Sequence, residues 1–219
     1  MNIRKIIGAM VGLFAMAAIV PAQAQTAIAP STNGVTVSGT GIITGTEIAP
    51  ALTSQLVSIN NGPSGTFTSQ VFQGFGGNPL GGLTFVYTIN ENVANVGDGF
   101  SGLTASGFAG FNTDVGFVTA NTTSSAAITA NRSNSTGNRL DFGFGPLTVS
   151  ANQVQLVVFT NSKNISFQTD SVANGGAHFV PAYGAAAPEP ASFAVFGFVG
   201  LGVLSLMVRA RRGKTQLAV

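Results

Sequence analysis

The sequence predicts an all-β fold, an antiparallel β-sandwich of jelly-roll-like form, on three observations. Short runs of alternating apolar and polar residues recur along the middle of the chain, with the period of two that a half-buried strand requires. Turn clusters rich in Gly and Asn separate these runs, and none of the runs has the 3.6-residue period of an amphipathic helix. The composition agrees, because only 7% of the 219 residues are charged and 29 are Gly.

The clearest strand is expected at 83–89, where four apolar side chains fall on one face: Leu83, Phe85, Tyr87 and Ile89. Alternation also predicts strands at 34–37, 139–144, 154–159 and 165–169, and shorter ones at 52–59, 66–72, 102–108, 115–119 and 126–130. Many short strands joined by tight turns are typical of two packed sheets, and we expect the 17 Phe residues to supply most of the core volume.

Charge is distributed unevenly along the chain. Six of the nine basic residues lie at the two ends, whereas residues 25–187 hold three bases against six acids. Those bases are Arg132, Arg139 and Lys163, and the acids are Glu47, Glu91, Asp98, Asp114, Asp141 and Asp170. A weakly acidic middle argues against nucleic acid as a partner, because phosphate binding needs clustered Lys and Arg. The absence of Cys excludes disulfides, thiolate metal sites and a thiol nucleophile.

The first 24 residues have the three-part layout of a secretory signal peptide. Arg4 and Lys5 precede an apolar stretch at 6–20, and small residues follow at Ala22 and Ala24. We expect signal peptidase to cleave after Ala24. The alternative is an uncleaved membrane anchor, although the apolar stretch is short for one.

The segment Ala191–Val208 is uncharged and, at about 18 residues, long enough to cross a bilayer as a helix. Four basic residues follow it and predict a stop to translocation, with residues 209–219 as a cytoplasmic tail: Arg209, Arg211, Arg212 and Lys214. The alternative is a buried helix of a soluble domain. The expected division is thus signal peptide 1–24, sandwich 25–180, Pro/Ala-rich stalk 181–190, transmembrane helix 191–208 and basic tail 209–219.

The stalk contains Pro188-Glu189-Pro190, in which two fixed proline rings hold one carboxylate on an extended, exposed stretch. This motif, the apolar segment and the Arg-rich end resemble the PEP-CTERM sorting signal of Gram-negative bacteria, from Ala187 to about Lys214. The same type of tail is also labelled an ice-binding protein C-terminal domain, a label that carries no evidence of ice binding.

The resemblance implies recognition by an exosortase, a membrane-embedded cysteine transpeptidase that cleaves near the motif. It also implies delivery of the mature protein to the cell surface or the extracellular polymer matrix, in bacteria that make exopolysaccharide and biofilm. It implies no shared activity, because such tails follow many unrelated domains.

The middle of the chain offers little catalytic chemistry. His178 is the only histidine, and although Asp170 lies eight residues before it, no G-x-S-x-G sequence presents a serine for a triad. Asp98 and Asp114 are the least unlikely carboxylate pair for glycoside hydrolysis, and either could belong to a calcium site. The stretch 97–102 matches G-x-G-x-x-G, but an extended segment is expected after it instead of the helix that a dinucleotide site needs.

Sugar-binding surfaces often use exposed aromatic rings, yet the chain has no Trp and only two Tyr. We expect Tyr87 on the apolar face of its strand and Tyr183 in the stalk. The prediction is therefore an exported, non-enzymatic surface or matrix protein without cofactor or metal, held transiently in the cytoplasmic membrane. The alternatives are an exopolysaccharide-binding or adhesion module on the same anchor, for which a flat Thr/Asn-rich surface remains open, and a hydrolase.

Overall fold

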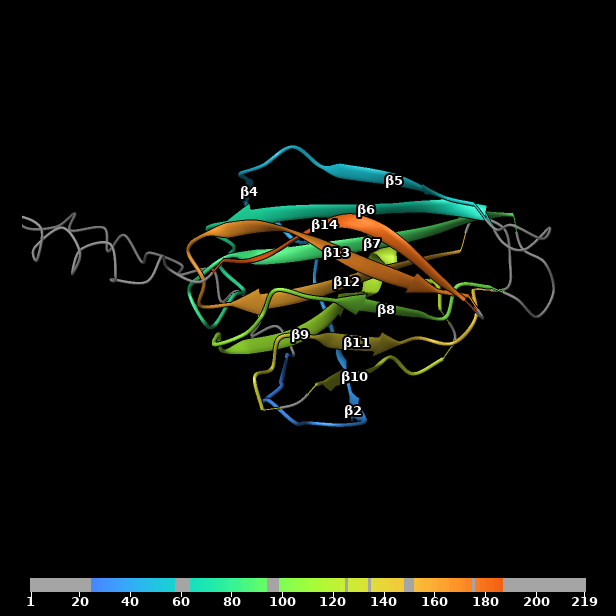
Figure 1. Ribbon diagram of the computed structural model, residues 1–219. Coiled ribbons are helices and arrows are strands. Elements are labelled where there is room, and N and C mark those ends of the chain that lie inside the picture. The colour runs from blue at the N-terminus through green and yellow to red at the C-terminus, as the bar shows by residue number, and fades with distance from the viewer. Residues whose placement is uncertain are drawn as a thin grey trace, which may run out of the picture.

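A computed structural model of the chain describes residues 25–57, 64–93, 99–124, 126–133, 135–147, 152–174 and 176–186. In this part of the chain two β-sheets form a sandwich-like, all-β fold, as the alternation predicted (Figure 1). Among the described residues the helical structure consists of one 3-10 turn, Thr119–Asn121. No helix of the described ranges is long and apolar enough to span a bilayer, and the segment expected to do so, 191–208, lies outside them.

The larger sheet has eight strands, in the order β1-β9-β12-β7-β6-β4, with β3 also paired to β9 and β5 to β6. Its strands are β1 (Thr26–Ala27), β3 (Ser38–Thr40), β4 (Thr46–Glu47), β5 (Leu52–Leu56), β6 (Ser64–Gln73), β7 (Thr84–Val93), β9 (Thr113–Val118) and β12 (Gln153–Thr160). All pairs are antiparallel except β3 with β9, which is parallel.

The smaller sheet has six strands, in the order β14-β13-β8-β11-β10-β2, and all its pairs are antiparallel. Its strands are β2 (Val35–Thr36), β8 (Gly102–Ala105), β10 (Thr129–Arg132), β11 (Leu140–Gly143), β13 (Ile165–Ala173) and β14 (Ala177–Ala185). Figure 1 shows β4 and β5 at the top of the molecule and β2 at the bottom.

The core lies between the inner faces of the two sheets. Alternate residues of β6 are buried, including Phe67 and Val71, because successive side chains of a strand point to opposite faces. Aromatic rings pack against one another here: Phe67 stacks on Tyr87 with centroids 6.1 Å apart, and Phe85 meets Phe108 edge-on at 5.6 Å. Among the described residues eight Phe side chains are buried, but buried Val, Leu and Ile are more numerous, so Phe is a large part of the core and not most of it as expected.

Strand β14 closes one side of the sandwich through Tyr183. The Tyr183 N–H donates to Ser69 Oγ on β6 at 3.0 Å, and Tyr87 Oη donates to the Tyr183 carbonyl at 2.6 Å. The Tyr183 hydroxyl donates to the Pro50 carbonyl at 2.9 Å. These bonds satisfy the edge of β14 with partners from the other sheet, so the two sheets are joined where they would otherwise expose backbone groups.

The expected boundary between sandwich and stalk at residue 180 falls inside this strand. β14 continues to Ala185, and Tyr183, predicted to lie in the stalk, is only 3% exposed. No strand is predicted at 181–185, because Ala, Gly and Pro181 have low strand preference. Pro181 lies opposite Thr169 and Ala182 is fully buried, so tertiary packing holds the segment in the sheet despite its composition.

Candidate functional site

All residues predicted to direct sorting lie outside the described ranges. These are Ala22 and Ala24 of the signal cleavage site, Pro188, Glu189 and Pro190 of the motif, and Arg209, Arg211, Arg212 and Lys214 of the basic cluster. The structure does describe the residues on the domain side of both predicted cuts. At the first, the Gln25 side chain donates to the Gly77 carbonyl, and Thr26 begins β1.

At the second, β14 ends with Ala185 paired to Ile165, and the Ala186 N–H donates to the Asn164 carbonyl at 3.0 Å. The chain therefore leaves the described domain beside the β12–β13 turn, which carries the exposed Lys163. A hollow of about 310 Å³ lies next to this exit, and the residues that line it include Asn138, Ser166, Gln168, Ala185 and Ala186. The sandwich thus ends within two residues of the expected motif.

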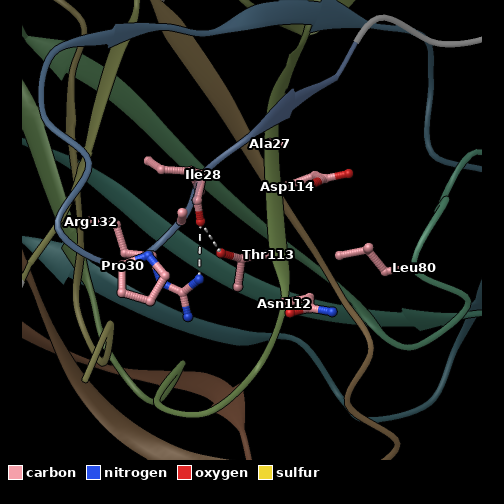
Figure 2. Close-up of a pocket in the computed structure, with 9 residues that line it drawn as sticks. Ala27, Ile28, Pro30, Leu80, Asn112, Thr113, Asp114 and Arg132 are labelled. Carbon is pink, nitrogen blue, oxygen red and sulfur yellow. Dashed lines mark hydrogen bonds between the residues drawn. The ribbon is translucent and has the colours of Figure 1, made fainter. Parts of the chain in front are cut away.

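A second hollow, of about 280 Å³, lies between the N-terminal segment and the start of β9 (Figure 2). Its lining includes Ile28, Leu80, Asn112, Asp114 and Arg132. Asp114 is half-buried, and this partial burial raises the pKa of its carboxyl. Figure 2 shows Asp114 pointing away from the Arg132 guanidinium, so the two charges do not face each other.

Arg132 is enclosed by the protein and only 1% exposed. Its guanidinium donates to four carbonyl oxygens, those of Gly137 (2.9 Å), Ile28 (3.0 Å), Phe108 (2.8 Å) and Phe111 (2.7 Å). Burial lowers its pKa, because the charged form loses hydration. Arg132 therefore holds three segments together, the one after β1, the β8–β9 loop and the β10–β11 loop, and this role is structural.

The same geometry weakens a calcium site at Asp114. The carbonyl of Ile28, which lines the same hollow, already accepts from Arg132 and from Thr113 Oγ1 at 3.2 Å. A guanidinium on that oxygen repels a second cation. Within the described ranges His, Asp and Glu form no group of three that could hold a metal ion, and Asp98 lies outside those ranges.

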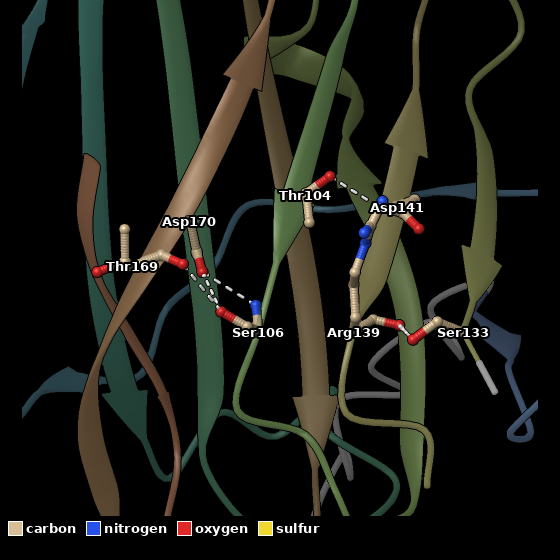
Figure 3. Close-up of polar contacts among 7 residues, drawn as sticks. All are labelled: Thr104, Ser106, Ser133, Arg139, Asp141, Thr169 and Asp170. Atoms are coloured by element: carbon tan, nitrogen blue, oxygen red, sulfur yellow. Dashed lines mark hydrogen bonds and ion pairs between the residues drawn. The ribbon is translucent and has the colours of Figure 1, made fainter. Parts of the chain in front are cut away.

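Asp170 and His178, considered above as parts of a triad, have separate partners. Asp170 Oδ1 accepts from both the backbone N–H and the hydroxyl of Ser106 at 2.9 Å (Figure 3). The His178 ring instead meets Phe100 edge-on, with centroids 6.1 Å apart. Serine and aspartate are thus in direct contact, without the imidazole that must stand between them in a triad.

Two carboxylates are buried more deeply than the sequence indicates. Asp170 is 1% exposed, its Oδ2 accepts no hydrogen bond, and burial raises its pKa to about 7, although the two Ser106 hydrogen bonds oppose the shift. Glu91 is fully buried, and burial likewise raises its pKa. Glu91 lies one step beyond Ile89 on the period-two apolar face of β7, so extending that alternation was an available signal for it, whereas nothing within 165–169 indicated that Asp170 is buried.

The outer face of the smaller sheet carries a polar row. Pairing aligns one row of outward residues across five strands: Phe179, Ser171, Thr104, Asp141 and Asn131. The Thr104 hydroxyl donates to Asp141 Oδ1 at 2.7 Å, and Arg139 Nε forms an ion pair with the same oxygen at 2.7 Å (Figure 3). The next outward row carries short side chains: Ala177, Ala173, Gly102, Gly143, Thr129 and Thr36.

Two Phe side chains stand out from this face. Phe167 is 74% exposed and Phe179 is 76% exposed, whereas most other described Phe side chains lie in the core. From the sequence, Phe is expected in the core and Tyr is the only aromatic considered for the surface. The exposure of Phe167 and Phe179 is therefore not predicted. Their exposure depends on how β13 and β14 pair, and the pattern within a single strand does not show this pairing.

G-x-G-x-x-G is followed by strand β8, as expected, and not by a helix. An added Cβ at Gly99 would lie 1.9 Å from the Leu147 carbonyl, so this glycine serves close packing.

No family model matches the sequence, and neither the curated proteins nor the solved structures include a match.

Proposed function

We propose that this is an exported, non-catalytic protein of the cell surface or extracellular matrix, whose C-terminal tail anchors it in the membrane until an exosortase processes it. One observation carries the proposal beyond the sequence motifs. Every described strand lies between Thr26 and Ala185, hence between the two predicted cuts after Ala24 and near Glu189. Both processing steps would leave the hydrogen bonds of the sandwich intact.

The order of segments gives each a separate task. Pro188 and Pro190 lack an N–H, so neither could donate to a β-pairing, and we expect the motif to be extended, with Glu189 accessible to an enzyme. The chain changes sheet on both sides of β2 and again between β7 and β8, β8 and β9, β9 and β10, β11 and β12, and β12 and β13, a connectivity that supports the jelly-roll-like domain we propose.

The test replaces Glu189 by Ala in the full chain and follows it in the cells that produce it. We expect the E189A chain to remain unprocessed in the membrane fraction, with an intact mass that retains residues up to Val219. The matched control is Glu47→Ala, which removes an exposed carboxylate of the sandwich and should be processed normally. Normal processing and surface delivery of the E189A chain would refute the sorting proposal.

A second candidate function, binding of exopolysaccharide, is favoured by the outer face of the smaller sheet. The outward row of hydroxyl, amide and carboxylate groups described above ends in the exposed ring of Phe179. Sugar rings stack their C–H faces on aromatic rings, and their hydroxyls bind carboxylates and guanidinium groups through charge-assisted hydrogen bonds. This face offers both kinds of contact to an extended polymer.

The test is cosedimentation of the protein with polymer isolated from the producing cells. Phe179→Ala and Thr104→Val should each weaken binding, because one removes the stacking ring and the other a polar group of the row. Ile42→Ala is the control, since Ile42 is exposed but lies outside this row. Equal binding by all four proteins would exclude this face as the polymer site.

A further inference from the structure

Phe167 projects from the outer face of β13 at the end of the sandwich where the chain leaves it. Its ring, 74% exposed, lies 5.3 Å from the ring of Tyr183, its partner on β14. Tyr183 is buried and its hydroxyl is bonded to Pro50, so the pair forms a fixed aromatic projection. Phe167 thus presents an apolar ring to whatever surface lies beside this end of the sandwich.

The position of Phe167 follows from the strand register. Ile165 pairs with Ala185, the last residue of β14, so Phe167 is two residues, or about 7 Å, from the exit. The exposed Lys163 is nearer still, in the turn whose Asn164 carbonyl accepts the Ala186 N–H, and its ammonium contacts the Gly81 carbonyl. Phe179 lies six residues before Ala185, about 20 Å along the strand.

The chain beyond the exit limits how far this end can be from a membrane. Five residue steps separate Ala186 from Ala191, where the apolar segment 191–208 begins, and they span at most about 18 Å. A sandwich held by that segment therefore keeps its exit end close to the lipid headgroups. With the strands upright on the bilayer, Phe167, about 7 Å from the exit, is the exposed ring nearer the lipid, and Phe179, about 20 Å from it, is the farther one.

We infer that the anchored protein rests its exit end on the phospholipid surface, with the Phe167 ring in the interfacial layer and Lys163 among anionic headgroups. Aromatic rings favour this layer, and a cation is attracted to the negative surface potential. The inference rests on the proposed tail anchor and adds an orientation to it. The row proposed for polymer binding, with Phe179, then lies farther from the bilayer than Phe167 does.

The experiment uses fluorescence, because the chain has no Trp and a single substitution creates a unique reporter. The chain from Gln25 to Val219, carrying F167W or the matched control F179W, is inserted into lipid nanodiscs with and without brominated acyl chains. Bromine quenches only nearby indole rings. We expect F167W emission to shift to the blue and lose at least half its intensity in brominated discs, whereas F179W emission stays unchanged.

Each other outcome overturns the inference in a distinguishable way. Failure of the chain to enter discs refutes the tail anchor and the docking with it. Insertion without quenching of F167W refutes the docking alone, and so does protection of F167W only after the cell polymer is added. Equal quenching of both reporters means that the sandwich lies flat on the membrane, which contradicts an end-on orientation.

A second reporter covers the case in which F167W fails to fold. Lys163→Cys gives a unique thiol in an exposed turn, and a nitroxide attached there should become more accessible to oxygen than to a water-soluble nickel chelate in discs. Unchanged relative accessibility at this site would also refute the docking.

Discussion

Asp170 and Arg132 show how single side chains in this sandwich depend on backbone partners. Each is 1% exposed, and the ion pair found in the described part of the chain, Arg139 with Asp141, includes neither. Arg132 is compensated by four carbonyl dipoles, whereas Asp170 is compensated only at Oδ1. The two residues therefore differ in what ionisation costs the fold.

Stability should fall as pH rises from acid to neutral because of Asp170. Its pKa rises from 3.8 to about 7 on folding, so between these values the native state holds a proton that the unfolded chain releases. The contribution is complete below pH 4 and is lost by about pH 7, a decrease of roughly 4 kcal/mol in the free energy of unfolding. Tyr87, whose pKa is raised by burial and by the Asp170 charge, stays neutral throughout this range.

Urea unfolding between pH 4 and 9 measures this effect. Asp170→Asn should reduce the slope of stability against pH and be more stable than the natural protein above pH 7. Asp141→Asn is the control, because its carboxylate lies at the surface, and it should keep the natural slope. A D170N protein with the same slope as the natural chain would mean that Asp170 does not titrate in this range.

Arg132→Lys should destabilise the fold by about 3 kcal/mol, since one ammonium cannot reach carbonyls on separate loops and leaves buried acceptors unpaired. Arg139→Lys, at a side chain 56% exposed, should change stability by less than about 0.5 kcal/mol. Urea midpoints at one pH compare the two. Similar midpoints would show that the four carbonyls are satisfied in another way.

At the scale of the element, β14 is the strand that the sequence concealed. It pairs along nine residues with β13, from Ile165 with Ala185 to Ala173 with Ala177, and Tyr183 joins it to the other sheet. Its second half, Pro181–Ala185, is mostly Pro, Ala and Gly, which have low strand preference, so the conformation there depends on partners outside the strand. A domain boundary drawn at residue 180 removes this joint.

Two truncated chains test this boundary. A chain of residues 25–186 should unfold in one cooperative transition, whereas a chain of residues 25–180 should lack a folded baseline and aggregate. The shorter chain leaves Ile165–Thr169 without a partner and exposes the core around Tyr87. Near-ultraviolet circular dichroism and urea titration measure the difference, and equal stability of the two chains would contradict a structural role for residues 181–186.

β13 shows why a correctly predicted strand can still be assigned the wrong face. Within 165–169, Ile165 and Phe167 are the apolar residues, which suggests that they point inward. In the structure Val172 and Asp170 are buried and Phe167 is exposed, because the strand continues to Ala173 and its other face packs against the core. Orientation was thus set by residues beyond the window that identified the strand.

For the whole molecule, processing should reverse the sign of the net charge. The precursor has a formal charge of +2, and loss of Arg4 and Lys5 with the signal peptide brings it to zero. Removal of the tail near Pro188 leaves three bases against six acids, or seven if Glu189 is retained, and the product is acidic. Isoelectric focusing of cell fractions should therefore show a basic precursor and an acidic mature form, and a mature form that stays neutral would mean that the basic tail is retained.

The sequence by itself determined the fold class and most strand positions, and it predicts the layout of the two ends, which lie outside the described residues. These features depend on local alternation, on turn residues and on uninterrupted apolar length, all of which a short window contains. Only the tertiary structure decided that β14 belongs to the sandwich, that Arg132 and Asp170 are buried, and that Phe167 and Phe179 are exposed. These properties depend on which strands become neighbours, and pairing between residues far apart in the chain leaves no trace in a local pattern.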